Sequence, residues 1–163
     1  MTEKFKYFWS NESPFSNWFK ADFELDGIKF CSTEQHMMYH KALLFKDPEI
    51  ATKILETRNP GKQKAFGRNV KNFRGDIWDK HCKEIVYQGN KGKFLQNENL
   101  LKHLFDTKGK TLVEASPVDA IWGIGLAEND PKAKNRHTWR GKNWLGEVLT
   151  KLRDDLINEG YGK

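Results

Sequence analysis

The sequence predicts a mainly helical α+β fold, built as a single domain over residues 1–163 around a small β-sheet. Two features favour this fold. Signals that start helices recur along most of the chain, whereas only a few short stretches alternate apolar and polar residues as strands do. The length is that of one ordinary domain and suffices to bury a core, and no repeat, low-complexity tract or linker divides it.

A β-hairpin is the first predicted element. Residues 23–25 and 28–30 alternate apolar and polar side chains on either side of Asp26-Gly27. Because glycine tolerates a positive φ, this pair favours a tight turn of the primed type. The sequence therefore predicts two short strands joined by that turn.

A series of helices follows the hairpin. Ser32 predicts the N-cap of the first helix, which ends near Phe45, with Gln35 placed to complete a capping box. Asp47 and Asn59 each precede a proline, which is favoured in the first turn of a helix. The helix that begins at Asn59-Pro60 extends to about Gly67. Another runs from about Ile77 to Gln96 and could break near Gly89 and Gly92. A further one runs from about Asn97 to Asp106, with Gly109 just beyond it.

The C-terminal part of the chain returns to a strand and then to a helix. Residues 111–115 predict a strand, and residues 130–143 predict a polar loop. The last helix is amphipathic and runs from Trp144 to about Asn158, with Asn143 as its N-cap.

Composition excludes several classes of protein. No stretch approaches the ~18 uninterrupted apolar residues of a membrane span, and the N-terminus lacks the apolar core of a secretory signal. Cys31 and Cys82 have no metal-type spacing, and neither do the five histidines. We therefore expect a cytoplasmic protein that has no membrane partner and uses no metal or other cofactor. The net charge of +6 favours anionic partners such as phosphates or nucleic acid.

Two ionisable residues share one face of the first predicted helix. Glu34 and Lys41 are seven positions apart, so they differ by only ~20° around the axis and lie ~10 Å apart along it, with Met38 between them. Burial there would raise the pKa of the carboxyl and lower that of the amine, as a proton donor and a nucleophile require. The alternative is that Glu34 is an exposed first-turn residue and that Lys41 extends past the methionines to solvent.

Asp119 follows the predicted strand and a proline turn. Trp122 and Gly123 come shortly after it, and the glycine permits close approach of the backbone to a ligand. An aspartate at a strand end is a candidate for chemistry, but it could equally cap a helix. The local pattern leaves both interpretations open.

Basic and aromatic residues supply candidate ligand contacts. Arg68 follows Gly67 at a predicted helix end, where its planar guanidinium could meet a phosphate. A solvated charged face is the alternative for such a run of cations. The six tryptophans also have two possible roles, packing in the core or stacking on a base. One short segment carries Lys62, Lys64, Arg68, Lys71 and Arg74, and a second basic group, Arg136, Arg140 and Lys142, surrounds Trp139.

Six short motifs occur in order from about Phe8 to Arg153. They are Pro14-Phe15-Ser16-Asn17; Ser32-Thr33-Glu34-Gln35 with Met38 and Lys41-Ala42; Gly67-Arg68 with Phe73 and Trp78; Lys93-Phe94 with Gln96 and Leu100; Glu114-Ala115-Ser116-Pro117 with Asp119 and Ile121-Trp122-Gly123-Ile124-Gly125; and Trp139-Arg140-Gly141-Lys142-Asn143-Trp144-Leu145-Gly146. In this order they resemble the YbiA-like, or NADAR, family. One departure is Arg74, which stands where many members carry an acidic residue after the Phe, and it could affect substrate preference.

The resemblance implies a compact, mainly helical α+β fold of the NADAR type. It also implies an N-glycosidase, a hydrolase that cleaves the bond between a phosphorylated ribose and a base. One branch of the family hydrolyses early phosphoribosylated precursors of riboflavin and releases ribose 5-phosphate, and another removes ADP-ribose from guanine bases of nucleic acid. The expected partner is therefore a small phosphoribosyl molecule or ADP-ribosylated guanine in nucleic acid.

The resemblance also suggests roles for the candidate site residues. Glu34 and Asp119 would share proton transfer and stabilisation of an oxocarbenium-like transition state. Lys41 would trap the ring-opened C1 as a Schiff base, a route proposed for the family, or would act as a cation on a phosphate or hydroxyl. The expected substrate contacts are Phe15 at the entrance, Arg68 on a phosphate, Trp78 and Trp122 on the base or ribose, and Gly123 beside the ligand.

Two rival functions belong to other classes. A module that binds ADP-ribose or NAD without cutting it would keep the aromatic and basic residues but would not need Glu34, Lys41 and Asp119 together. A general nucleic-acid binder would carry one continuous basic stripe, whereas Asp76 and Asp79 follow directly after the basic run. The sequence therefore favours an enzyme.

Overall fold

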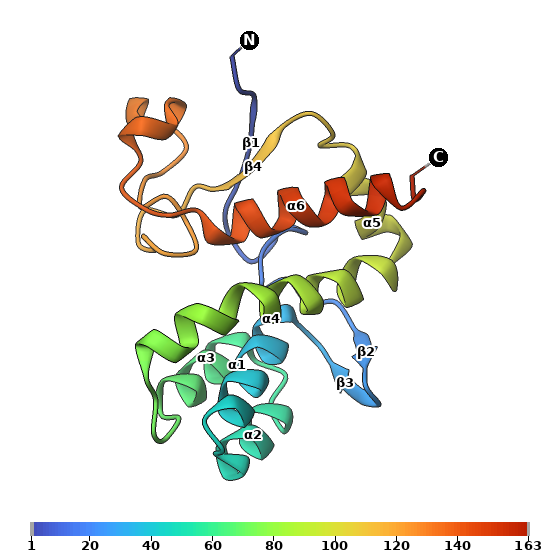
Figure 1. Ribbon diagram of the computed structural model, residues 1–163, viewed down its shortest axis with the longest axis vertical. Helices are drawn as coiled ribbons and strands as arrows, with labels where there is room; N and C mark the ends of the chain where they lie inside the picture. The colour runs from blue at the N-terminus through green and yellow to red at the C-terminus, as the bar shows by residue number, and fades with distance from the viewer. Residues whose placement is uncertain (1, 163) are drawn as a thin grey trace. The chain divides into compact units, whose positions relative to one another are not determined.

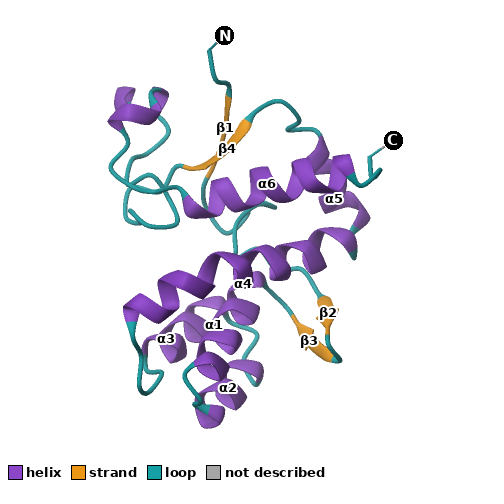
Figure 2. Ribbon diagram, in the orientation of Figure 1, coloured by secondary structure: helices purple, strands orange, loops and turns teal. Residues whose placement is uncertain are grey.

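The computed structural model describes residues 2–162 and confirms a mainly helical α+β fold with little strand (Figure 2). Its contacts form two compact units. The central unit is Asn17–Glu98, and the terminal unit combines the chain up to Ser16 with the chain from Asn99 onward. The assignment of all residues to one domain stays a prediction. Within residues 2–162, no helix has both the length and the apolar character to cross a membrane.

The predicted hairpin is confirmed in the central unit. Strand β2 (Phe23–Leu25) pairs antiparallel with β3 (Ile28–Phe30). At the turn, Asp26 has a φ of 54° and Gly27 a φ of 79°. These two positive φ values are those of a type I′ turn, which explains why this pair of residues joins the strands.

Four helices complete the central unit: α1 (Thr33–Leu44), α2 (Pro48–Leu55), α3 (Pro60–Arg68) and α4 (Gly75–Leu95). The first three begin where the sequence predicts. Ser32, Asp47 and Asn59 each accept a hydrogen bond from a backbone N–H in the first turn of the helix that follows. Helix α1 packs against the other three, which Figure 1 shows gathered around it.

Helix α4 runs unbroken through the two glycines where the sequence suggested a break. A Cβ atom at Gly89 would lie 2.5 Å from Nδ1 of His36, and one at Gly92 would lie 2.9 Å from Cδ1 of Leu25. Glycine therefore occurs at these positions because neighbouring side chains pack directly on the α4 backbone. The expected break is wrong, because close packing and not a turn requires the missing side chains.

The capping box at α1 is only half formed. The N–H of Gln35 donates to Oγ of Ser32 (3.0 Å), as predicted. The Gln35 side chain accepts from the N–H of Cys31 (2.8 Å) instead of that of Ser32. Its amide also donates to the carbonyls of Ile54 (3.0 Å) and Thr57 (3.1 Å). This buried amide therefore ties α1 to the end of α2 as well as to its own cap.

The terminal unit is built on a parallel strand pair. Strand β1 (Phe5–Phe8) pairs in parallel with β4 (Thr111–Glu114), so that Phe5 lies opposite Thr111. The sequence predicted β4 but not β1. Helices α5 (Glu98–Phe105) and α6 (Trp144–Asn158) are confirmed, and the predicted polar loop contains two 3-10 turns, Pro131–Lys134 and Arg136–Thr138.

Side chains of α6 and its N-cap occupy the edge of β4 that β1 leaves open. The Asn143 side chain accepts from the N–H of Glu114 (3.0 Å) and donates to the carbonyl of Leu112 (3.0 Å), while Oγ1 of Thr150 accepts from the N–H of Leu112 (2.9 Å). Gly146 permits this approach, because a Cβ there would lie 2.1 Å from the carbonyl oxygen of Leu112. Asn143 thus stands at the predicted N-cap position, but its side chain bonds the strand instead of the helix's first turn.

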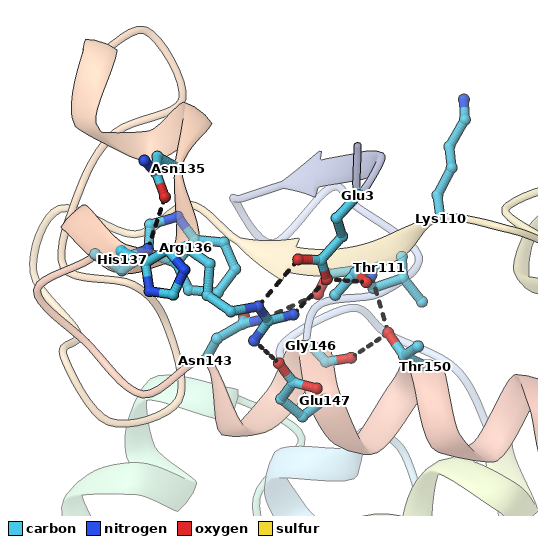
Figure 3. A network of polar contacts seen from close by, with 12 residues as sticks. Glu3, Lys110, Thr111, Asn135, Arg136, His137, Asn143, Gly146, Glu147 and Thr150 are labelled. Atoms are coloured by element: carbon cyan, nitrogen blue, oxygen red, sulfur yellow. Dashed lines mark hydrogen bonds and ion pairs between the residues drawn. The ribbon is translucent and has the colours of Figure 1, made fainter. Parts of the chain in front are cut away.

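Arg136 fastens the start of the chain to the 3-10 turn and to α6 (Figure 3). Its Nε donates to Oε1 of Glu3 (3.0 Å), and its Nη1 donates to Oε1 of Glu147 (2.6 Å). Oε2 of Glu3 also accepts from Oγ1 of Thr111 (2.7 Å). This network holds β1 in register beside β4.

Candidate active site

Glu34 lies in the first turn of α1 with only 4% of its surface exposed. The segment before the hairpin covers this turn: the N–H of Glu34 donates to the carbonyl of Asn17 (2.9 Å), and Oγ1 of Thr33 donates to Oδ1 of Asn17 (2.7 Å). The alternative in which Glu34 is an exposed helix-start residue is therefore wrong. A carboxyl group enclosed in this way suits proton transfer better than it suits surface solvation.

Lys41 is half-buried two turns further along α1. Its Nζ lies 4.6 Å from the centroid of the Phe73 ring and 5.6 Å from that of the Trp78 ring. Burial lowers the pKa of Lys41 below the usual 10.5, the negative charge of Glu34 opposes this shift, and the positive charge of Arg68 adds to it. A larger fraction of the amine is therefore neutral at neutral pH than for an ordinary lysine.

Arg68 is brought to Lys41 by a close crossing of α1 and α3. It is the last residue of α3 and is exposed. Beside it, Gly67 faces Met38 so closely that a Cβ there would lie 2.0 Å from the sulfur and 3.3 Å from the methionine Cβ. The absence of a side chain at Gly67 lets α3 lie against α1, and the guanidinium therefore contributes to the potential at Lys41.

Two aromatic rings complete this group. Trp78 is half-buried on α4, as a residue that packs and also contacts substrate would be. Phe73 was given no role by the sequence, although it belongs to a recognised motif; it is 47% exposed and packs edge-on against Phe45, with ring centroids 5.3 Å apart. Asn72 before it adopts a φ of 60°, which turns the chain ahead of α4 and presents the ring to Lys41. The signal in the sequence was an asparagine, which adopts positive φ more readily than most residues, directly before an aromatic residue.

Asp119 belongs to the terminal unit and is half-buried in a loop after β4. Its Oδ1 accepts from the N–H groups of Ile121 and Trp122, both at 2.9 Å. Oγ of Ser116 accepts in turn from the N–H of Asp119 (3.1 Å). Residues 117–126 are bends and irregular backbone with no helix, so the alternative in which Asp119 caps a helix is wrong. Its carboxylate is held by backbone donors through one oxygen.

Trp122 and Gly123 lie in the same loop. The Trp122 ring meets the Trp144 ring edge-on, with centroids 5.7 Å apart. A Cβ at Gly123 would lie 2.9 Å from the carbonyl oxygens of both Asp119 and Glu114. The packing of the loop on itself is thus sufficient to require glycine at this position, and contact of Gly123 with a ligand stays a prediction.

Phe15 also lies in the terminal unit. It is 5% exposed and packs edge-on against Phe8, with ring centroids 5.6 Å apart. This environment is that of a core residue. Its predicted place at the entrance of the site stays a prediction.

The structure thus brings together Glu34, Lys41, Arg68 and Trp78 in the central unit, and Asp119, Trp122 and Gly123 in the terminal unit. Within residues 2–162, no group of three or more His, Cys, Asp and Glu side chains is placed to hold a metal ion. His36 and His40, one turn apart, lie in an aromatic cluster with ring centroids 4.4 Å apart, and burial lowers the pKa of His36 to about 3.

Comparison with known proteins identifies the family. The NADAR domain model matches residues 7–157. N-glycosidase R617 of Acanthamoeba polyphaga mimivirus is 49% identical over 146 residues, which cover 86% of each protein. The riboflavin biosynthesis protein PYRR, chloroplastic, of Zea mays is 35% identical over 114 residues, which cover 70% of this chain and 15% of that protein. Among solved structures, the NMR structure of the E. coli protein YbiA matches with a TM-score of 0.79 at 25% identity, covering 100% of this chain and 90% of that one.

These similarities show that the chain is an enzyme, a hydrolase that acts on N-glycosyl bonds. The chain belongs to the NADAR domain family.

Proposed function

We propose that the enzyme hydrolyses the C1–N bond of phosphorylated ribosides, with early phosphoribosylaminopyrimidine intermediates of the riboflavin pathway as the first candidates and ribose 5-phosphate as a product. The observation that carries the proposal is the half-buried Lys41 beside the buried Glu34, with Arg68 close by. An amine, a carboxyl group and a guanidinium are the groups that a phosphorylated sugar with a leaving base would require. The similarity to a maize protein named for riboflavin biosynthesis supports the choice of substrate.

Glu34 and Asp119 are proposed to manage charge during bond cleavage. Departure of the base leaves oxocarbenium-like character on C1, which nearby carboxylates stabilise. One of the two carboxyl groups protonates the leaving base, and the other stabilises the positive ribose. The enclosure of Glu34, which is 4% exposed, supports a role in the reaction, because a carboxyl group held by protein groups acts from a fixed position and not from solvent.

Lys41 is proposed to act as a nucleophile. As the base departs with a proton from a carboxyl group, the neutral amine of Lys41 bonds to C1. The C1–O4′ bond of the ribose ring then breaks, one amine proton passes to O4′, and a protonated imine links C1 to Lys41. Water then hydrolyses the resulting imine, which restores the amine and releases the sugar as its aldehyde. The lowered pKa of Lys41 supports this role, because only the neutral amine has a lone pair to donate.

The remaining residues are proposed to hold the substrate. Arg68 binds the 5′-phosphate, for which a guanidinium fork is well shaped. Trp78 and Trp122 contact the base or ribose through their ring faces. Phe15 borders the entrance, and Gly123 lies beside the ligand.

The test incubates the purified protein with the phosphoribosylaminopyrimidine intermediate and follows released sugar phosphate by mass spectrometry. Glu34→Gln should reduce release by about 10²-fold or more, the scale of general acid–base catalysis. Glu49→Gln is the matched control, because Glu49 is also a first-turn glutamate but is exposed on α2. Equal rates in the wild type and Glu34→Gln would remove Glu34 from the mechanism.

Asp119→Asn separates chemistry from folding. An asparagine keeps the side-chain oxygen that accepts from the N–H groups of Ile121 and Trp122, so the loop should be preserved. We expect unchanged thermal stability and strongly reduced cleavage. A variant that melts normally and cleaves at the wild-type rate would exclude a catalytic Asp119.

Borohydride reduction tests the Schiff base. With substrate present, reduction should leave a stable sugar-phosphate adduct on the peptide that contains Lys41. Lys41→Arg keeps the positive charge and should give neither adduct nor turnover. If that variant cleaves normally, or if no adduct forms on an active wild type, Lys41 serves as a cation and not as a nucleophile.

Removal of ADP-ribose from guanine in nucleic acid is the second candidate function. The observation that favours it is the group of five cations between Lys62 and Arg74, one of which, Arg68, acts electrostatically on Lys41. An oligonucleotide carrying ADP-ribosylated guanine belongs in the same assay, and release from only one substrate would name the activity. Release from neither at high enzyme concentration would favour a module that binds ADP-ribose without cutting it.

A further inference from the structure

The amine of Lys41 lies against two aromatic rings that come from different segments of the chain. Its Nζ is 4.6 Å from the centroid of the Phe73 ring and 5.6 Å from that of the Trp78 ring. Trp78 belongs to α4, whereas Phe73 lies in the turn between α3 and α4. The cover over this amine therefore depends on a turn as well as on a helix.

The turn that carries Phe73 is held at both ends. Before the ring, the N–H of Lys71 donates to Oδ2 of Asp47 (2.9 Å). After it, Arg74 forms an ion pair with Asp76 (2.9 Å) in the first turn of α4. These contacts fix the path of the backbone on either side of Phe73.

The Phe73 ring itself has a fixed direction. Asn72 before it adopts a left-handed φ of 60°, and the ring meets the Phe45 ring edge-on, with centroids 5.3 Å apart. Phe45 is 6% exposed, but Phe73 is 47% exposed. Packing in the core therefore explains only part of the position of this ring, and the contact with the Lys41 amine is the other part.

Charge alone does not account for the environment of the Lys41 amine. The charges that act on it are those of Glu34 on α1 and Arg68 on α3. Glu34 has the larger effect of the two and favours the protonated amine, so these charges together would raise the pKa. The pKa of Lys41 is nevertheless lowered, and burial is the cause. The side chains that exclude water from the amine therefore decide its protonation.

We propose that Phe73 is a positioning residue of the cleavage reaction: its ring covers the amine of Lys41 and keeps bulk water away from it. Phe73 acts through Lys41 and does not need to touch the sugar. The proposal rests on the proposed function, because the nucleophilic step requires a neutral amine. It adds to that function a side chain that maintains the neutral form.

The ring has two opposite effects on the amine. By excluding water it disfavours the ammonium form, whereas the negative face of the ring attracts that form. Phe73→Ala removes both the cover and the ring face. Phe73→Leu removes the ring face but keeps an apolar side chain over the amine. The two substitutions therefore distinguish exclusion of water from attraction by the ring.

The first experiment titrates Lys41 without any substrate. Lysine amines are reductively methylated with isotope-labelled formaldehyde, their methyl signals are followed by NMR against pH, and Lys41→Arg assigns the signal. Burial shifts the pKa of fully buried groups by up to about 3–5 units. Because Lys41 is half-buried, Phe73→Ala should raise its midpoint by about one pH unit. Phe73→Leu should leave the midpoint at or below the wild-type value.

Leu43→Ala is the matched control. Leu43 is 44% exposed on the same helix, but it is two positions from Lys41 and projects about 200° away around the axis. Its truncation should leave the midpoint of Lys41 unchanged. Equal shifts in Phe73→Ala and Leu43→Ala would overturn the proposal. A Phe73→Ala protein that melts earlier but titrates like the wild type would overturn it as well, because the ring would then support the fold alone.

The second experiment follows kcat/KM against pH, which reports protonation of the free enzyme. The wild-type rate should rise with pH as Lys41 loses its proton. In Phe73→Ala the rise should move to higher pH by the shift found in the titration, with about a tenfold loss of rate below the midpoint for each unit. Phe73→Leu should restore the wild-type rise. A rate that falls equally at every pH would mean that the ring contacts substrate instead of shielding the amine.

Titration and cleavage fail independently in these experiments. If Phe73→Ala shifts the midpoint but the wild type cleaves no phosphoriboside, the ring shields Lys41 and the proposed reaction is removed. If the wild type cleaves a phosphoriboside but Lys41 titrates alike in the wild type and Phe73→Ala, the reaction stands and the role of Phe73 is overturned.

Discussion

Replacement of Asn143 by alanine should destabilise the protein by about 3 to 6 kcal/mol. The Asn143 side chain is fully buried and makes two hydrogen bonds to β4, one with the N–H of Glu114 and one with the carbonyl of Leu112. Its backbone is left-handed, with φ 55° and ψ 37°. Alanine would leave two backbone groups without these partners and would place a Cβ in a disfavoured conformation.

The magnitude follows from these losses. Each buried backbone group left without a partner costs about 1–3 kcal/mol, and a left-handed residue other than Gly, Asn or Asp costs roughly 1 kcal/mol more. The Glu114 N–H is only partly buried, so the lower half of its range applies. A loss of this size is a large fraction of the roughly 5–15 kcal/mol that stabilises an ordinary domain.

Urea unfolding followed by tryptophan fluorescence measures the effect. Asn143→Gly removes the same hydrogen bonds, but glycine adopts the left-handed conformation without strain. The loss of stability should therefore be about 1 kcal/mol smaller than in Asn143→Ala. Asn129→Ala, at an exposed asparagine of the same unit, should stay within about 0.5 kcal/mol of the wild type. An Asn143→Ala protein as stable as Asn129→Ala would refute the argument that this side chain completes the edge of β4.

Three further outcomes are expected. Gly89→Ala should lower the melting temperature, because overpacking costs about 1–3 kcal/mol and this exceeds the gain in helix propensity. Gly75→Ala should not lower it, because no described atom lies within 4 Å of the Cβ that would be added there. Equal shifts of the two melting temperatures would contradict this prediction. The hydrogen bond from Arg136 lowers the pKa of Glu3, so this group contributes stability above its unfolded pKa near 4.5 and loses it as pH falls through the lower folded value. Glu3→Gln should therefore flatten the acid side of urea midpoints plotted against pH, and an unchanged profile would show that the ion pair adds nothing. Because burial lowers the pKa of Lys41, cleavage should rise with pH and level off below 10.5. A rate that still rises through pH 10.5 would exclude a lowered pKa of this amine.

Local chemistry was sufficient to predict most elements. Ser32, Asp47 and Asn59 cap helices through their own side chains, and Asp26-Gly27 adopts the positive φ values that its turn requires. These features depend on residues within a few positions of one another, so the sequence carries them directly.

The errors arose where distant segments meet. Strand β1 is only four residues long and exists because β4, more than a hundred residues away, pairs with it. Gly89 suggested a broken helix because its contact, the ring of His36, is invisible in the local pattern. Both are tertiary contacts that override local preference.

For the site, the sequence identified Glu34 and Lys41 as residues on one helix face and left their burial open. Only the fold decided that Glu34 is enclosed, because Asn17 and the chain around it cover the first turn of α1. Only the fold set the electrostatics of Lys41, because Gly67 allows α3 to bring Arg68 beside it. Helical spacing is a property of the chain, whereas solvation and potential depend on what packs around a group, and this is fixed only when the helices meet.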